Sequence, residues 1–170
     1  MLEETDIIYR EEQRFALWLR AVLVVSMALA VVLSILPLTK IPFDQLRAEV
    51  GEIILLFVVG VFFPVGIAVL FCFLKLETQV RPDGLYVRFV PFHIKFKKFG
   101  ADDLRQYYAR KYRPIWEYGG WGIRCSFRNG RAYNVSGNKG LQLVFKDGKR
   151  LLIGSQTPED LEQAIRRIFD

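Results

Sequence analysis

Two long stretches without a charged residue constrain this chain more than any other feature of its sequence. The first, from Ala21 to Leu38, has 18 residues, and the second, from Ile53 to Leu74, has 22. Helices of these lengths would extend about 27 and 33 Å, close to the thickness of the hydrocarbon core of a bilayer. Neither stretch carries the polar stripe of a surface helix. We therefore expect two membrane spans, at about residues 16–38 and 53–74.

Two other interpretations of these stretches are weaker. A buried helical hairpin would need a protein shell, and the 96 residues of the segment 75–170 are too few to wrap one. A cleaved signal peptide has a shorter apolar region and a basic, not acidic, leading segment, whereas Glu3, Glu4 and Asp6 precede this one. The first span is therefore expected to be retained.

The Lys and Arg residues that flank the spans predict their orientation. The N-terminal flank carries three Arg residues, the loop from Thr39 to Glu52 carries only Lys40 and Arg47, and several basic residues follow the second span. Both termini are expected in the cytoplasm, which makes the chain a multi-pass protein of the cell inner membrane with the lipid bilayer as a partner.

Small residues recur on one face of the first stretch, at Ser26, Ala30 and Ser34. The second stretch contains Gly60 and Gly66, which reduce its width. Small faces allow helices to approach closely. They indicate either packing of the two stretches on each other or a homo-oligomer formed through the spans. Neither stretch contains an Asp, Glu, Lys, Arg or His, which disfavours a transporter or pump.

The segment 75–170 has a different character. It contains 19 Lys and Arg against 10 Asp and Glu, and its apolar residues alternate with a period of two. Turn sequences such as Asn129-Gly130 and Asp147-Gly148 separate the alternating runs. The expected strands are 76–80, 85–89, 94–97, 105–113, 121–127, 131–135, 141–145 and 150–153.

A helix is expected after these strands. Thr157 is a good N-cap and Pro158 suits the first helical position, and Leu161, Ile165 and Phe169 share one face. Seven or eight antiparallel strands and one helix are the order of a pleckstrin-homology-like (PH-like) β-barrel with a C-terminal capping helix. The predicted fold class is thus an α+β membrane protein, with residues 1–74 forming an N-terminal segment and transmembrane hairpin and residues 75–170 a cytoplasmic PH-like domain.

Three runs of sequence carry a resemblance to a known family: Tyr112–Arg124, Ala132–Asn138 and Leu152–Gln156. They resemble a signature of a family of uncharacterised bacterial membrane proteins. Members of that family have two spans and a soluble part similar to bacterial PH domains, so the resemblance implies the same fold and location here. It implies no activity.

Residue types that support catalysis are scarce. The chain has one His, His93, and two Cys, and it lacks a P-loop and a hydrolase nucleophile elbow. Cys125 alternates with apolar residues and is expected to be a core thiol. We expect no enzyme, no cofactor and no metal site.

A loop rich in Gly and Trp is the first candidate binding site. It could hold an anionic group or the chain of a protein partner, or it could be a strand connection whose glycines permit tight geometry. Its candidate residues are Arg113, Trp116, Tyr118, Trp121 and Arg124.

Basic residues form the second candidate site. Arg88, Lys95 and Lys97 lie on neighbouring strands, and Lys139 lies in the run Ser136–Gly140, which could offer N–H groups to a phosphate or could be a hairpin loop. Such residues could contact anionic lipid headgroups, or they could be ordinary solvated charges.

The function that these features favour is a membrane-anchored PH-like scaffold that engages a protein partner at the cytoplasmic face of the membrane. The alternative is a sensor or binder of anionic lipid headgroups or of a phosphate-bearing ligand. Nucleic acid is not expected as a partner, although the excess of 9 positive charges in residues 75–170 could attract it.

Overall fold

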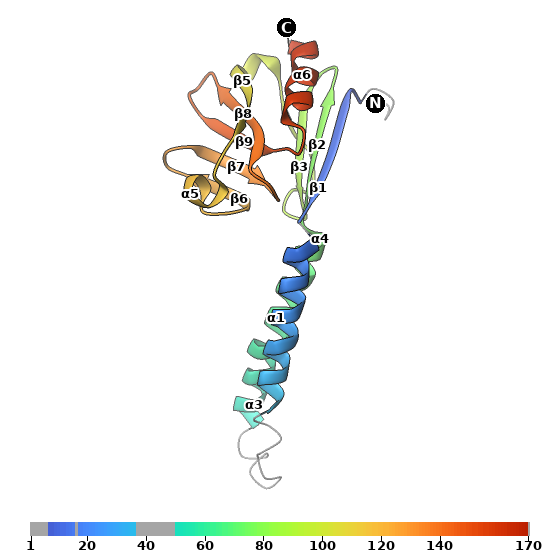
Figure 1. Cartoon of the computed structure of the whole chain (residues 1–170), viewed down its shortest axis with the longest axis vertical. Coiled ribbons are helices and arrows are strands. Elements are labelled where there is room, and N and C mark those ends of the chain that lie inside the picture. The colour runs from blue at the N-terminus through green and yellow to red at the C-terminus, as the bar shows by residue number, and fades with distance from the viewer. Residues whose placement is uncertain (1–6, 16, 37–49, 170) are drawn as a thin grey trace. The chain divides into compact units, whose positions relative to one another are not determined.

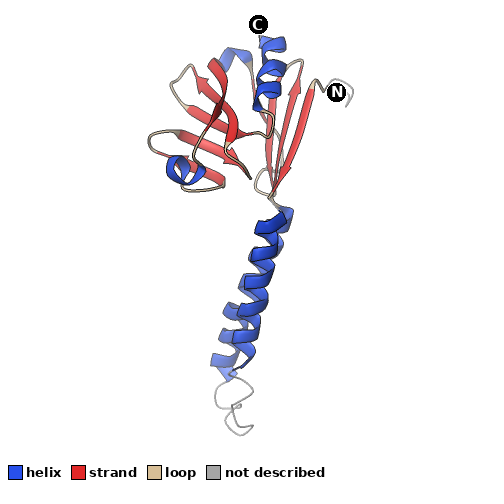
Figure 2. Ribbon diagram, in the orientation of Figure 1, coloured by secondary structure: helices blue, strands red, loops and turns tan. Residues whose placement is uncertain are grey.

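The computed structural model of the protein describes residues 7–15, 17–36 and 50–169. The described residues form two compact units. The first, here called the sheet unit, combines residues 7–14 with residues 74–169, and the second, the helical unit, comprises the described residues between 15 and 73. Figure 1 shows the elements of each unit and Figure 2 their secondary structure.

The helical unit contains α1 (Leu17–Ile35), α3 (Val50–Phe57), the π-helical turn η3 (Val58–Phe62) and α4 (Phe63–Phe73). Helix α1 packs along η3 and α4. At the closest approach, a Cβ added to Gly60 would lie less than 3.0 Å from the side chain of Ser34, whose hydroxyl donates to the carbonyl of Ala30. Gly60 and Ser34 therefore contribute to packing of the two stretches on each other, whereas nothing lies within 4 Å of a Cβ added to Gly66.

Among the described residues, no helix is long and apolar enough to cross a membrane. Helix α1 includes Arg20, and the uncharged part that follows it, Ala21–Ile35, has 15 residues. At about 1.5 Å per residue this part is about 22 Å long, against a hydrocarbon core of about 30 Å. In the second stretch, η3 separates two α-helices of 8 and 11 residues.

This finding overturns the prediction of two membrane spans. The predicted multi-pass placement in the cell inner membrane, with both termini in the cytoplasm, depended on those spans. That prediction is therefore wrong too. Residues 16 and 37–38 of the first predicted span, and the loop that follows to residue 49, lie outside the described residues.

The first sheet of the sheet unit has four antiparallel strands in the order β1-β2-β3-β4. They are β1 (Tyr9–Arg14), β2 (Lys75–Arg81), β3 (Gly84–Val90) and β4 (Lys97–Phe99). The apolar residues of β2 and β3 alternate inward, so that Leu76, Val80, Leu85, Val87 and Phe89 are buried. The expected strands here match β2 and β3, whereas the strand expected at 94–97 lies later, at β4.

The second sheet has five strands in the order β5-β8-β9-β7-β6. They are β5 (Leu104–Lys111), β6 (Gly122–Ser126), β7 (Gly130–Asn134), β8 (Lys139–Phe145) and β9 (Arg150–Gly154). Between the sheets and within this one, the chain forms the short helices η4 (Ala101–Asp103) and α5 (Pro114–Tyr118). Strands β7 and β9 are parallel neighbours, and the other pairs in this sheet are antiparallel.

Helix α6 (Pro158–Phe169) packs against β2 and β3 of one sheet and β5 and β8 of the other (Figure 1). It buries Leu161, Ala164 and Ile165, and the ring of Phe169 packs edge-on against Tyr107. The apolar face of the helix is buried as the sequence predicted, but the helix packs against both sheets and does not cap the end of a barrel.

The predicted PH-like antiparallel barrel is wrong for the sheet unit. The structure has two sheets of four and five strands, β7 and β9 run parallel, and one strand, β1, comes from before the helical unit. The segment Ser136–Gly140 is not a hairpin loop either, because β7 and β8 are not paired with each other. An α+β fold of two sheets with one long covering helix describes this unit.

The carboxylate of Glu11 links strand β1 to the segment that leads into α6. Glu11 accepts hydrogen bonds from the hydroxyls of Tyr9 at 2.6 Å and Ser155 at 2.7 Å, from the side-chain amide of Gln13 at 2.8 Å, and from the main-chain N–H of Gln156 at 2.6 Å. Burial and the bond to Glu11 raise the pKa of Tyr9 to about 12. The sequence before the helical unit is therefore part of the fold of the sheet unit.

Candidate functional site: a basic groove between the two sheets

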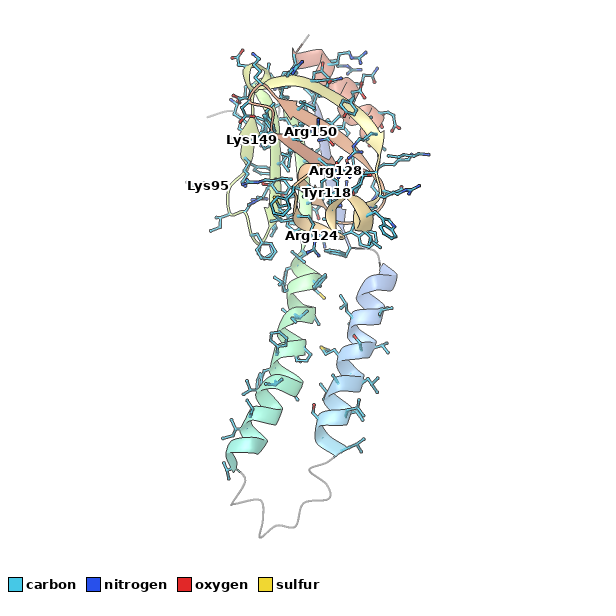
Figure 3. The ribbon with its side chains drawn as sticks, turned by 90° about the vertical axis from the view of Figure 1, so that its left-hand side faces the viewer. Lys95, Tyr118, Arg124, Arg128, Lys149 and Arg150 are labelled. Carbon is cyan, nitrogen blue, oxygen red and sulfur yellow. The ribbon has the colours of Figure 1, made fainter. Side chains whose placement is uncertain are left out.

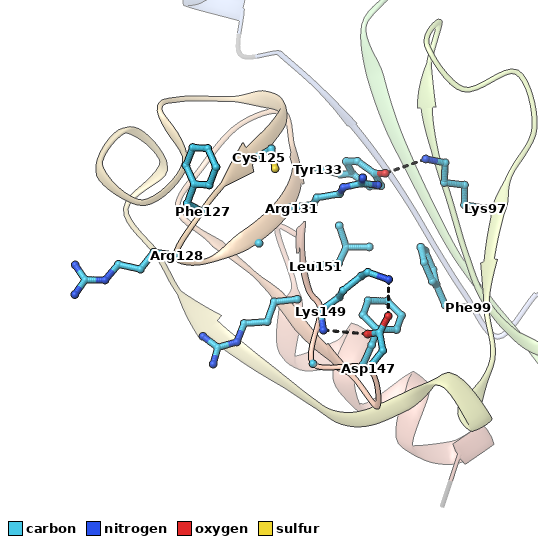
Figure 4. A pocket seen from close by; sticks show the side chains of 14 residues that line it. Lys97, Phe99, Cys125, Phe127, Arg128, Arg131, Tyr133, Asp147, Lys149 and Leu151 are labelled. Carbon is cyan, nitrogen blue, oxygen red and sulfur yellow. Dashed lines mark hydrogen bonds and ion pairs between the residues drawn. The ribbon is translucent and has the colours of Figure 1, made fainter.

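A cavity of about 800 Å³ opens on the sheet unit, and we call it the basic groove. Strand β4 lines one side, the tip of the β6–β7 hairpin lines another, and the tip of the β8–β9 hairpin completes it (Figure 4). Its lining includes five cationic side chains and one carboxylate: Lys97, Arg128, Arg131, Lys149, Arg150 and Asp147. An apolar floor accompanies these charges: Phe99, Phe145, Leu151 and the ring of Tyr133.

The parallel pairing of β7 and β9 explains why the cations gather. In this register Arg131 lies opposite Leu151, next to Arg150. Both strands therefore begin at the same edge of the sheet, and the turns that precede them, which carry Arg128 and Lys149, meet there too. Because parallel strands start at the same edge, basic residues at their beginnings converge.

Gly130 allows the two hairpin tips to approach each other. It has a φ of +78°, in the left-handed region, and a Cβ at this position would lie less than 3.0 Å from the main-chain oxygen of Arg150. Only a residue without a side chain fits this close approach. The apolar floor contains one ring from each sheet, Phe99 of β4 and Phe145 of β8. The centroids of these two rings lie 5.6 Å apart.

Each of the two lysines of the groove has one polar partner. Lys97 donates to the hydroxyl of Tyr133 at 3.0 Å, and Lys149 contacts the carboxylate of Asp147 at 2.6 Å (Figure 4). The hydrogen bond from Lys149 lowers the pKa of Asp147. Beside the groove, burial and the charge of Lys97 lower the pKa of His93, so this histidine adds no positive charge at neutral pH.

The three arginines of the groove are differently placed. In the part of the chain that the structure describes, the guanidinium groups of Arg128, Arg131 and Arg150 have no hydrogen-bond or ion-pair partner. Figure 4 shows the side chain of Arg131 directed towards Tyr133 and Lys97, whereas Arg128 extends outward from the rim. Figure 3 labels Arg128, Lys149 and Arg150 on the hairpins that border the groove. Arg131 and Lys97 are exposed, as Arg128 is, but Arg131 is directed towards Tyr133 and Lys97, whereas Arg128 is a rim cation.

Of the four basic residues predicted to contact anionic lipid, only Lys97 lines the groove. Arg88 is engaged by the buried carboxylate of Glu77, to which its Nε donates at 3.0 Å, and Lys75 pairs with the same carboxylate. Lys95 is exposed on the segment before β4, and Lys139 begins β8, opposite Lys111 of β5. The structure therefore does not bring these four residues together.

The Glu77 ion pairs predict a pH dependence of stability. Burial would raise the pKa of Glu77, but hydrogen bonds from Lys75 and Arg88 outweigh it and lower the pKa below its ordinary value of 4.5. A lowered folded-state pKa adds stability above the unfolded-state pKa, and this stability is lost as pH falls through the folded-state pKa. Glu77→Gln should cost about 2 kcal/mol at neutral pH and should lose less stability than the wild type on acidification.

Urea unfolding at neutral pH and at about pH 3 measures both effects. Asp102→Asn is the matched control, because Asp102 is an exposed acidic residue in the short helix η4. An equal acid-induced loss in the wild type and in Glu77→Gln would contradict the assignment.

The Gly- and Trp-rich loop forms a partly buried structure around α5. Tyr118 is buried, and Trp121 donates its ring N–H to the carbonyl of Gly137 at 3.0 Å. Arg124 donates to the main-chain oxygen of Trp121 at 2.9 Å. Arg113 is exposed at the start of α5, and Trp116 is 86% exposed.

The structure therefore brings Trp121 and Arg124 together and directs Tyr118 inward, while Arg113 and Trp116 face outward. Engagement of a protein partner by this loop stays a prediction, as do the homo-oligomer and the absence of nucleic-acid binding.

Most residues of the groove were not among the candidates predicted from the sequence. Cys125, expected in the core, is exposed and lines the groove. Among the described residues, no group of three His, Cys, Asp or Glu side chains is placed to hold a metal ion. The sequence did contain a signal for this groove, because basic residues lie beside the turns Asn129-Gly130 and Asp147-Gly148. They are Arg128, Arg131, Lys149 and Arg150.

Comparison with known proteins identifies the family. A family of unknown function, DUF6141, has a model that matches residues 2–169. The chain belongs to this family. No curated protein and no solved structure matches it. An uncharacterised family agrees with the resemblance found in the sequence, and membership assigns no activity to the basic groove.

Proposed function

We propose that this protein is a non-catalytic binding module that holds a phosphate-bearing anion in the basic groove. The observation that carries the proposal is the charge of the lining, where five cationic side chains surround a cavity of about 800 Å³ with a single carboxylate. A concave site that concentrates one sign of charge attracts the opposite charge and strengthens its binding.

The identity of the cations favours a phosphate group as the anion. Arginine presents a planar fork of donors that matches phosphate oxygens, and three arginines border this groove. Arg131 has no partner among the described residues and is directed towards Tyr133 and Lys97, and Lys97 is oriented by its hydrogen bond to Tyr133. These two side chains offer donors without first losing a strong ion pair.

Binding, not catalysis, fits the side chains of the groove. Its one carboxylate, Asp147, is paired with Lys149, and His93 beside it accepts a hydrogen bond from the main-chain N–H of Phe89. General acid–base catalysis needs a group free to exchange a proton at the substrate. The cations can neutralise and position an anion, which is what a binding module requires.

Titration of the full chain with glycerol 3-phosphate tests the proposal. Arg131→Ala and Lys97→Ala should each weaken binding about tenfold, because a hydrogen bond to a charged group contributes about 1.5–3 kcal/mol. Lys95→Ala is the matched control, since it removes a nearby lysine that does not line the groove. Isothermal titration calorimetry at two salt concentrations should also show weaker binding at higher salt.

The phosphate could be carried by a free ester or by a lipid headgroup, and vesicles of phosphatidylglycerol separate these sources. Binding of the vesicles without binding of glycerol 3-phosphate assigns the site to headgroups, and the reverse assigns it to free esters. If neither binds, or if Arg131→Ala and Lys97→Ala bind as well as the wild type, the proposal fails.

A further inference from the structure

We infer that the ligand of the basic groove is a phosphate ester that carries a flat aromatic ring, and that Phe127 recognises the ring. This inference rests on the proposed function and names the chemical class of the ligand. It draws on three observations: the size of the cavity, the aromatic side chains in its lining, and the position of Phe127 on a braced turn.

The cavity is much larger than a phosphate group. Sites of about 300–1,000 Å³ enclose whole organic ligands, and the groove, at about 800 Å³, lies in the upper part of that range. A phosphate held by Arg131 and Lys97 would occupy one part of it. The remaining space must receive the group to which the phosphate is attached.

The remaining lining is rich in aromatic and aliphatic surface. The rings of Phe99 and Phe145 are in contact on the floor, and Leu151 belongs to the same lining; Figure 4 labels Phe99 and Leu151. Phe127 lines the groove from the tip of the β6–β7 hairpin. Flat aromatic groups are recognised by stacking on such rings, and arginines at the rim can add cation–π contacts.

Phe127 is fully exposed, yet the turn that carries it is held firmly. The N–H of Asn129 donates to the hydroxyl of Ser126 at 3.3 Å, and the side-chain amide of Asn129 donates to the carbonyl of Glu117 at 3.2 Å. The hydroxyl of Tyr118 donates to the carbonyl of Asn129 at 3.4 Å. The turn is thus tied to α5 while its largest apolar side chain remains in solvent.

This combination favours a role in binding. Exposure of a whole Phe ring forgoes the stabilisation that burial would provide. A braced main chain loses little conformational freedom when a ligand binds, so a ring presented on it is preorganised for stacking. We therefore assign Phe127 to the wall of the groove that covers the aromatic part of the ligand.

Adenosine monophosphate and ribose 5-phosphate are the matched probes, because they share the sugar phosphate and differ by the base. The wild-type full chain should bind adenosine monophosphate about tenfold more tightly. Phe127→Ala should remove that preference, because it should weaken the binding of adenosine monophosphate about tenfold more than the binding of ribose 5-phosphate, and Phe127→Trp should restore the preference. Calorimetric titration of the three proteins with both probes measures these differences.

The outcomes separate this inference from the proposed function. Equal affinity of the wild type for the two probes, or a preference that survives in Phe127→Ala, would overturn the assignment of an aromatic ligand while leaving a phosphate site. Failure of both probes, of glycerol 3-phosphate and of the phosphatidylglycerol vesicles to bind would remove the phosphate site itself, whereas binding of the vesicles alone would overturn only the aromatic ligand.

Discussion

Replacing Gly130 by Ala should lower the free energy of unfolding by about 3 kcal/mol and weaken phosphate binding in the same protein. Two costs add at this position. The left-handed φ of +78° strains any residue with a Cβ, and that Cβ would collide with the main-chain oxygen of Arg150. Since a main-chain oxygen cannot rotate away, the two hairpins would have to separate and widen the basic groove.

Gly137 provides a matched control for this prediction. It has the same φ of +78°, and nothing lies within 4 Å of a Cβ added there. Gly137→Ala should therefore cost only the conformational strain, about 1 kcal/mol. Urea unfolding measures the two losses and calorimetry with glycerol 3-phosphate measures binding. Equal losses in the two variants would show that the close approach of the hairpins contributes nothing.

Glu11→Ala should destabilise the sheet unit by about 3 kcal/mol, because it removes the acceptor of four hydrogen bonds at once. Ser155 is buried, so its hydroxyl would lose its acceptor where water has little access, and the buried side-chain amide of Gln13 would keep only its bond to the carbonyl of Gly154. The expected structural result is local opening of β1 from the segment that leads into α6.

The neighbouring residue Glu12 is the control. Its carboxylate pairs with Arg14 and Lys75 on the exposed side of β1, and such pairs contribute less than about 1 kcal/mol. Urea unfolding of both variants tests the difference, and amide hydrogen exchange of β1 should quicken in Glu11→Ala alone. If Glu12→Ala were equally destabilising, the hydrogen bonds to Glu11 would not be the interactions that hold β1 to the segment before α6.

Local patterns in the sequence predicted much of the second half of the sheet unit. Alternation between turns located β2, β3, β5 and the strands from β6 to β9 within a few residues. Thr157, Pro158 and the apolar face of Leu161 and Ile165 located α6. These signals succeed because turn geometry and the burial of one face depend on neighbouring residues.

The parts of the structure that were not predicted depend on contacts between residues that are far apart in the sequence. Strand β1 is a run of mostly charged residues, and its inward side chains, Tyr9, Glu11 and Gln13, are polar groups that become satisfied only when they meet β2 and residues 154–157. The basic groove depends on the parallel pairing of β7 with β9. An antiparallel series of hairpins, which the turn signals favoured, would have placed the beginnings of neighbouring strands at opposite edges.

The apolar stretches were misjudged for another reason. Their total length in the sequence suggested two continuous spans, but the chain divides the second at η3 and includes Arg20 within the first helix. A hydropathy sum does not detect such interruptions, because the position of an interruption depends on main-chain geometry and on where each helix begins.

Because β1 pairs with β2 across residues 15–74, the helical unit is an insertion between two adjacent strands of one sheet. Pairing of β1 with β2 must therefore close an intervening segment of 60 residues, 15–74. Ribosomal synthesis imposes an order as well: β1 emerges first and must wait for the whole insertion before its sheet partner exists. A fragment that starts at residue 75 would leave the edge of β2 without its neighbour, open to pairing with another chain.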